Sequence, residues 1–150
     1  MTKEKIACKK KSLDLLARRE HSVLELTSKL LERDFSEDLV ANVLDSLVEE
    51  GILNDERYAK EFLYFKSAKG QGPVKIKSQL QQKGIKSQSI DTVIEGSDQD
   101  WIALAKQVLD KRFGKEVIND TKDYAKRSRY LVSRGFKAEH ILNVLGSPYE

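Results

Sequence analysis

Basic side chains dominate one segment of this 150-residue sequence. Between residues 57 and 86 there are eight lysines and arginines against a single acidic residue, Glu61. Lysine can neutralise a phosphate, or meet a carboxylate on a protein, without a fixed bidentate geometry. The segment, called the middle basic segment below, therefore predicts an anionic partner, with ordinary solvated helix faces as the alternative. Its basic residues are Arg57, Lys60, Lys66, Lys69, Lys75, Lys77, Lys83 and Lys86.

Two further basic groups lie nearer the ends of the chain, and acidic segments separate them from the middle one. Residues 25–56 hold ten acidic residues against two basic ones, although the net charge of the chain is +3. Such alternation can offer basic surface to an anionic partner while acidic surface limits indiscriminate binding to nucleic acid. The first group is Lys9, Lys10, Arg18 and Arg19, and the second is Arg112, Lys126, Arg127, Arg129 and Arg134.

Aromatic residues share the middle basic segment with these cations, and such a combination suits single-stranded nucleic acid because bases stack on aromatic rings. Tyr58, Phe62 and Phe65 follow the i, i+4, i+7 spacing of one helix face. That spacing predicts a place in the core rather than a stacking platform. Tyr64 lies on another face of the same predicted helix, so it is the better candidate for an exposed contact.

Residues that could catalyse a reaction or bind a metal are scattered. His21 and His140 lie far apart, no nucleophile motif surrounds any serine, and the lone Cys8 cannot form an internal disulfide. The turn at 70–72 lacks the third glycine and the lysine of a phosphate-binding loop. We therefore predict no enzyme activity, no metal and no cofactor. The apolar runs are far shorter than the ~20 residues of a membrane span, so we expect a cytoplasmic protein without a membrane partner.

The elements that position these residues repeat with a period near fifty. In each repeat, one helix has a cationic residue in its last turn, and a C-cap position follows it. A second helix then carries apolar residues at core spacing. Gly84 and Gly135 occupy two of the C-caps, where glycine readily takes a left-handed conformation, and Asp34, a weaker choice, occupies the first. The aligned segments are 30–44, 80–94 and 131–145.

A further helix precedes each pair, so the sequence predicts an all-α fold of three tandem three-helix, helix-turn-helix-like repeats. We expect the repeats to span 1–53, 54–96 and 97–150 and to stack into an elongated, curved array. Gly70 and Gly72 form the turn in the second repeat, and Pro73 opens its next helix. The residues expected to start helices are Ser22 with Glu25 in a capping box, Ser36, Asp55, Ser87, and Ser97 with Asp100.

The middle third of the chain is specific enough to resemble a known family. Residues 51–85 resemble the signature of the regulatory protein RecX, which has a Leu-(Asp/Asn)-Asp-x-Arg-(Phe/Tyr)-Ala stretch, a basic helix end, a Gly-Tyr-Gly-Pro turn and a helix ending in Lys-Gly-Ile. Gln71 stands where the family usually has an aromatic residue, and Val74 and Lys75 stand where arginines are common. The matching residues are Leu53, Asn54, Asp55, Arg57, Tyr58, Ala59, Gly70, Gly72, Pro73, Ile76, Leu80, Lys83, Gly84 and Ile85.

The resemblance implies one three-helix module repeated three times and a regulatory function. Members of the family bind the nucleoprotein filament of the recombinase RecA and curb its strand exchange and ATP hydrolysis in recombination, DNA repair and the SOS response. RecA and the RecA–DNA filament are therefore the implied partners of a monomeric chain, and contact with single- or double-stranded DNA stays open. The implied contact residues are Arg18, Arg19, Arg57, Tyr64, Lys66, Lys69, Lys75, Lys77, Lys83, Lys86, Arg127 and Arg134.

Two other functions are compatible with the sequence. A sequence-specific DNA-binding regulator also uses helix-turn-helix pairs. The helices that begin after Ser36 and Ser87, however, have acidic or neutral outer positions and no arginine placed to read a guanine edge. A helical scaffold that binds a protein and no nucleic acid predicts the same fold, and binding to DNA or to RecA filaments would exclude it.

Overall fold

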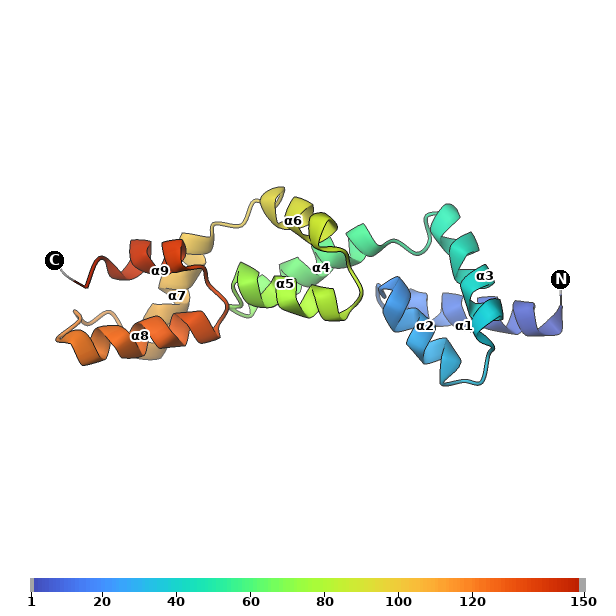
Figure 1. Cartoon of the computed structure of the whole chain (residues 1–150), viewed down its shortest axis with the longest axis horizontal. Helices are drawn as coiled ribbons and strands as arrows, with labels where there is room; N and C mark the ends of the chain where they lie inside the picture. The colour runs from blue at the N-terminus through green and yellow to red at the C-terminus, as the bar shows by residue number, and fades with distance from the viewer. Residues whose placement is uncertain (1, 149–150) are drawn as a thin grey trace. The chain divides into compact units, whose positions relative to one another are not determined.

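The computed structural model describes residues 2–148, and this part of the chain contains nine helices and no strand (Figure 1). The all-α prediction is confirmed. None of these helices combines the length and hydrophobicity that crossing a bilayer requires. The helices are α1 (Lys3–Arg18), α2 (Val23–Leu31), α3 (Glu37–Glu49), α4 (Asp55–Ala68), α5 (Pro73–Gln82), α6 (Ser87–Glu95), α7 (Trp101–Phe113), α8 (Thr121–Ser133) and α9 (Ala138–Leu145).

The chain folds as two compact units. The N-unit contains the described residues up to Glu61 together with Leu80–Ile90. The C-unit contains Phe62–Gln79 together with the described residues from Asp91 onward. Helices α4, α5 and α6 therefore each contribute residues to both units.

In the N-unit, α2 packs on α3, and α1 contacts both (Figure 1). Ser22 caps α2 as predicted, because its Oγ accepts the N–H of Glu25 at 3.0 Å. The Glu25 carboxylate, however, turns to Arg19 instead of completing a capping box. Ser36 caps α3 through the N–H of Leu39 at 3.3 Å, also as predicted. One cluster of its buried core consists of Cys8, Leu15, Leu26, Leu30, Val40, Val43, Leu44, Leu47 and Leu53.

In the C-unit, α7 packs against both α8 and α9, which also pack on each other. Asp100 caps α7 by accepting the N–H of Ala103 at 3.0 Å. The prediction that Ser97 opens this helix is wrong. Ser97 lies just after the end of α6, so its hydroxyl donates to the carbonyl of Ile94 at 2.8 Å. One cluster of its buried core consists of Leu104, Ala105, Leu109, Leu131, Phe136 and Ile141.

The N-terminus of α4 corrects a second predicted cap. Asn54 Oδ1 accepts the N–H of Arg57 at 2.9 Å, so Asn54 and not Asp55 caps this helix. Asp55 is the first residue of α4, and its carboxylate accepts the N–H of Val23, the first residue of α2, at 2.8 Å. Asp55 thus stabilises the start of a different helix, which local sequence spacing does not reveal.

The buried face of α4 also differs from the predicted one. Tyr58 is buried as expected, but Phe65, seven residues later, is 53% exposed. The buried face is centred on Ala59 and Leu63, which are 0% and 6% exposed. Because each residue turns the helix by about 100°, Phe65 points roughly 140° away from the centre of that face, and its predicted place in the core is wrong. Tyr64 is 69% exposed, in agreement with the prediction.

Glycine permits a close approach between two turns of the C-unit. The N–H of Gly72 donates to the carbonyl of Arg134 at 2.7 Å, and the N–H of Val74 donates to that of Gly135 at 2.8 Å. A Cβ atom on Gly72 would lie 2.5 Å from the Gly135 carbonyl carbon and oxygen. The turn before α5 and the turn between α8 and α9 are therefore joined backbone to backbone.

Candidate interaction surfaces

Arg57 of the middle basic segment is engaged inside the N-unit. Its terminal nitrogens donate to the carbonyls of Gly51 and Ile52 at 3.0 and 2.8 Å, and its Nε pairs with Glu20. These bonds hold the connection between α3 and α4. The guanidinium uses all three nitrogens in this way, so its placement indicates a structural role.

Other predicted contact residues are neutralised by carboxylates of the chain itself. Arg19 binds both oxygens of Glu25 at 3.0 and 2.8 Å, and Lys83 Nζ lies 3.7 Å from the same carboxylate. Burial opposes ionisation of Glu25, but the hydrogen bond and charge of Arg19, supported by Lys83, lower its pKa to about 2. In the C-unit, Lys77 pairs with Asp91 at 2.7 Å.

The end of α4 in the C-unit carries two exposed aromatic rings, the half-buried Lys66 and, just beyond the helix, the exposed Lys69. Tyr64 and Phe65 meet edge to face with ring centroids 5.5 Å apart. Lys66 Nζ lies 5.3 Å from the centroid of Phe62, and Lys69 is exposed beyond the helix end. Among the described residues, no carboxylate forms an ion pair with either lysine. The α4 patch is defined as Tyr64, Phe65, Lys66 and Lys69.

Arg127 of α8 and Arg134, the C-cap residue that follows this helix, have partners within the C-unit. Arg127 is only 6% exposed; its Nε donates to Asp123 and its Nη1 to the carbonyl of Glu116, both at 3.1 Å. Arg134 donates from Nη2 to the carbonyl of Lys69 at 2.7 Å. Both side chains therefore help to position neighbouring backbone.

The remaining predicted residues are open to solvent to different degrees. Arg18 and Lys86 are exposed, and Lys75 is half-buried where the Gly135 backbone approaches it. The structure thus divides the predicted residues between the units. Arg18, Arg19, Arg57, Lys83 and Lys86 belong to the N-unit, and Tyr64, Lys66, Lys69, Lys75, Lys77, Arg127 and Arg134 to the C-unit.

The side chains whose chemistry could support catalysis, His21 and Cys8, are buried within the fold. His21 Nδ1 lies 3.0 Å from the carbonyl of Arg19, its Nε2 lies 2.8 Å from Lys29 Nζ, and burial lowers its pKa. Burial also raises the pKa of the Cys8 thiol, which disfavours the reactive thiolate. Within residues 2–148, no three or more His, Cys, Asp or Glu residues are grouped so that they could hold a metal ion.

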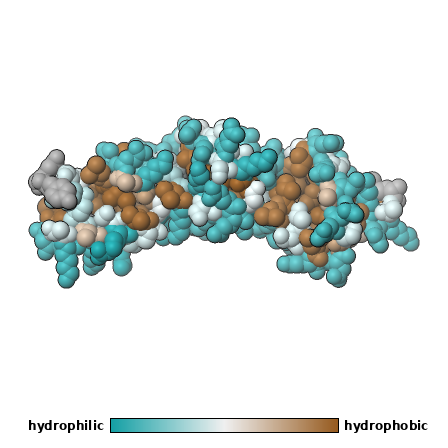
Figure 2. All heavy atoms as spheres, in the orientation of Figure 1, coloured by the Kyte–Doolittle hydropathy of each residue, from teal (hydrophilic) through white to brown (hydrophobic). Residues whose placement is uncertain are grey.

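An apolar groove of about 610 Å³ lies along α8 and α9 of the C-unit. Val132 and Leu142 are exposed in its walls, as is Val74 at the start of α5. Figure 2 shows hydrophobic side chains gathered over α8 and α9 on the visible face. The groove offers apolar contact area within the C-unit.

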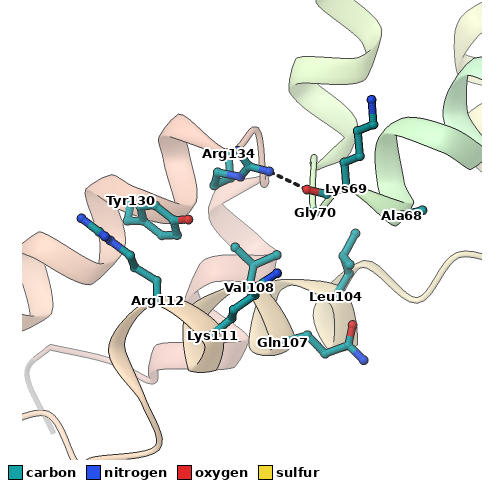
Figure 3. Close-up of a pocket in the computed structure, with 10 residues that line it drawn as sticks. All are labelled: Ala68, Lys69, Gly70, Leu104, Gln107, Val108, Lys111, Arg112, Tyr130 and Arg134. Carbon is teal, nitrogen blue, oxygen red and sulfur yellow. Dashed lines mark hydrogen bonds between the residues drawn. The ribbon is translucent and has the colours of Figure 1, made fainter.

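Sequence reasoning missed three candidate contact residues: Phe65, Lys111 and Tyr130. A signal for Phe65 was present, because Ala59 and Leu63 already mark a small and apolar stripe on another face of α4. Lys111 and Tyr130 line a recess that forms when α7 and α8 pack together (Figure 3). No local pattern predicts such a recess.

Three family models match consecutive parts of the chain. The first, second and third three-helix domains of RecX match residues 8–47, 54–94 and 98–145. The regulatory protein RecX of Pseudomonas entomophila is 37% identical over 140 residues, which cover 93% of this chain and 90% of that protein. The chain belongs to the RecX family. The regulatory protein RecX of Halorhodospira halophila is 40% identical over 130 residues, which cover 87% of this chain and 81% of that protein.

Crystal structures of RecX proteins share this fold. RecX from Lactobacillus salivarius matches with a TM-score of 0.83 at 20% identity, over 99% of both chains. A second structure, of regulatory protein RecX, matches with a TM-score of 0.80 at 22% identity, over 95% of this chain and 71% of that one. Together with the three matched domains, this likeness confirms the predicted fold of three three-helix repeats.

Proposed function

We propose that this chain binds RecA and the RecA–DNA filament and restrains strand exchange and ATP hydrolysis by RecA, without catalysing a reaction of its own. Membership of the RecX family, whose relatives are named regulatory proteins, supports a regulatory function. The structural observation that carries the proposal is the α4 patch. The proposal places the protein in the cytoplasm as a monomer.

The α4 patch suits a partner that combines anionic groups with flat apolar surface. Its lysines can meet phosphates or carboxylates, because an ammonium needs no fixed geometry. Its exposed aromatic pair can stack on a base or pack on an apolar side chain. A RecA subunit and the DNA within a filament both offer such groups. Cations that are already neutralised, such as Lys77 and Arg19, contribute less to this contact.

A bound chain restrains RecA only if it prefers one state of the filament. A ligand shifts an equilibrium by its differential affinity for the two states and by nothing else. Exposed cations occur in both the N-unit and the C-unit, so one chain can meet a repeating filament at more than one point. If the chain makes these contacts with only one arrangement of the RecA subunits, it opposes the rearrangements that ATP turnover and strand exchange require.

ATP hydrolysis by RecA on single-stranded DNA tests the proposal when the protein is titrated into the reaction. The variant Lys66→Glu/Lys69→Glu reverses the cations of the α4 patch. Its control, Lys106→Glu/Lys122→Glu, makes the same charge change at exposed lysines elsewhere in the C-unit. We expect the wild-type chain and the control to inhibit, and the patch variant to be about ten-fold less potent, since two exposed ion pairs contribute up to about 1 kcal/mol each.

Absence of inhibition by the wild-type chain at stoichiometric excess would contradict the proposal. It would favour the two alternative functions, a sequence-specific DNA-binding regulator or a helical scaffold. Equal loss of potency in both variants would assign the inhibition to overall charge instead of the α4 patch.

A further inference from the structure

A recess of about 490 Å³ lies in the C-unit between the end of α4 and helices α7 and α8 (Figure 3). This volume falls within the roughly 300–1,000 Å³ that is typical of small-molecule sites. Four cationic side chains line the recess, and none of its lining residues is acidic. The cations are Lys69 just after α4, Lys111 and Arg112 from α7, and Arg134 just after α8.

Arg134 is fixed in the wall of the recess and retains an unused donor. Its Nη2 donates to the carbonyl of Lys69 at 2.7 Å, whereas its Nε is buried with no hydrogen-bond partner in the described structure. Leaving a buried N–H without an acceptor is costly, so an anionic oxygen that reached it would be bound favourably. Gly70 allows this arrangement, because an added Cβ would lie 3.3 Å from Arg134 Nη2 and 3.0 Å from Val108.

The cations on α7 differ in how available they are to a ligand. Lys111 and Arg112 are exposed, and no carboxylate among the described residues forms an ion pair with them. The Arg112 guanidinium lies 5.7 Å from the ring centroid of Tyr130, which holds it at the wall. Figure 3 shows the Lys69 ammonium directed away from the α7 side chains, while its carbonyl faces Arg134. Figure 3 also shows the Arg112 guanidinium extending away from Lys111 and Arg134, on the Tyr130 side of the recess. The cations that remain for a ligand are therefore those of Lys111 and Arg134.

We infer that this recess binds a phosphate group, presented either by a nucleotide or by a nucleic-acid backbone. A phosphate or polyphosphate offers several acceptor oxygens and more than one negative charge. It therefore matches a site lined by several cations and no acidic residue better than a single carboxylate does. The guanidinium of Arg134 supplies the fixed planar donor that such oxygens favour. This inference is independent of RecA binding, and its test contains no RecA.

The test is an NMR titration of the full-length ¹⁵N-labelled chain with sodium pyrophosphate at constant ionic strength. Saturable shifts are expected at the amides of Val108 and Lys111 and at the Arg134 Nε–H. Shifts that rise linearly without saturation, or that affect Lys75 and Lys86 equally, would overturn the inference. They would indicate diffuse attraction of anions to all basic surface.

Two α7 variants make the test specific. Lys111→Gln removes a cation of the recess, and Lys106→Gln removes an exposed lysine of the same helix that does not line it. We expect pyrophosphate binding to weaken at least about three-fold in the first variant and to stay unchanged in the second. Equal effects would overturn the assignment of the site. Both substitutions are at exposed positions, so the test does not depend on replacing the partly structural Arg134.

Parallel titrations identify the source of the phosphate. ATP represents the nucleotide, and a short oligothymidylate represents the nucleic-acid backbone. If either one saturates the same resonances, the result supports the inference and identifies the source of the phosphate. Pyrophosphate binding without either would reduce the recess to a site for adventitious ions only and overturn it. If sodium glutamate saturated the same resonances with the same affinity as pyrophosphate, the phosphate inference would be overturned. The recess would then be assigned to an acidic protein segment.

Discussion

Asp55 and Arg57 show how the most distinctive residues of the sequence are used within the fold. The Asp55 carboxylate binds the first N–H of α2, and Arg57 binds the carbonyls of Gly51 and Ile52. Both interactions tie the start of α4 to the helices before it. These signature residues therefore serve folding, and the side chains left for a partner, such as Lys69, lie at less distinctive positions.

The Glu25 carboxylate supports a pH-dependent prediction. Its folded-state pKa of about 2 lies below the ordinary 4.5, so the ionised form favours the folded state. This stabilisation is fully present above pH 4.5 and is lost as the pH falls towards 2. We expect Glu25→Gln to be less stable than the wild-type chain by about 1–2 kcal/mol at neutral pH, after allowance for solvent screening, and by much less near pH 3.

Urea unfolding of both proteins at the two pH values measures this difference. A difference that stayed constant between pH 7 and pH 3 would contradict the role given to the Arg19–Glu25 pair. Ion pairs of this kind could not be predicted from the sequence. Ser22 and Glu25 have the spacing of a capping box, but only packing brings Lys83, in the turn after α5, to the same carboxylate.

The orientation of α4 gives a prediction at the level of the helix. Leu63 faces the interior, whereas Phe65 is 53% exposed. Leu63→Ala should therefore destabilise the chain by about 2–4 kcal/mol, because it removes buried contacts and leaves a cavity. Phe65→Ala should change the free energy of unfolding by less than about 0.5 kcal/mol, as is usual for surface substitutions. Thermal and urea unfolding compare the two variants, and a larger loss for Phe65→Ala would contradict the observed buried face.

The joined turns of the C-unit give a second prediction at this level. In Gly72→Ala the new Cβ would lie 2.5 Å from backbone atoms of Gly135, so the hydrogen bonds across the junction must lengthen or break. We expect a loss of about 2–3 kcal/mol in unfolding free energy. Gly114→Ala is the control, because its Cβ meets nothing within 4 Å and only its positive φ is unfavourable. Similar losses in both variants would show that the close approach itself contributes little.

Helices and their turns were the most predictable features, because their signals are local. Ser36 caps its helix through a residue three positions away, and Gly135 ends α8 with a positive φ of 93°. The errors at Ser97 and Asp55 arose where a residue serves a different helix from the one expected. The aromatic error on α4 had another cause, since three aromatic residues at helical spacing outweighed the smaller Ala59 in the sequence pattern.

At the level of the whole molecule, the sequence repeat and the packing describe different things. The sequence repeat reflects three copies of one local helix pattern. The division into two compact units depends instead on which side chains pack together. The backbone bonds from Gly72 and Val74 to the turn between α8 and α9 place the start of α5 in the C-unit. Residues 80–90, from the end of the same helix onward, belong to the N-unit. No periodicity in the sequence predicts that division.

The small net charge of the whole molecule limits how it can bind DNA. Net charge is only +3, so tight salt-sensitive binding must come from local clusters of cations and not from overall attraction. If about four phosphates of a single strand are neutralised, raising the salt from 50 to 200 mM should weaken binding roughly fifty-fold. The variant Lys66→Glu/Lys69→Glu should reduce that factor to roughly seven-fold if both lysines meet phosphates.

Fluorescence anisotropy with a labelled oligonucleotide measures both salt dependences, and the Lys106→Glu/Lys122→Glu variant should keep the wild-type slope. A flat response for the wild-type chain would remove phosphate contact from the proposed function. It would not remove RecA, because the lysines of the α4 patch can meet acidic side chains as readily as phosphates. Inhibition of RecA together with a flat DNA response would therefore assign the patch to the protein subunits of the filament, and inhibition with a steep response would assign it to the DNA.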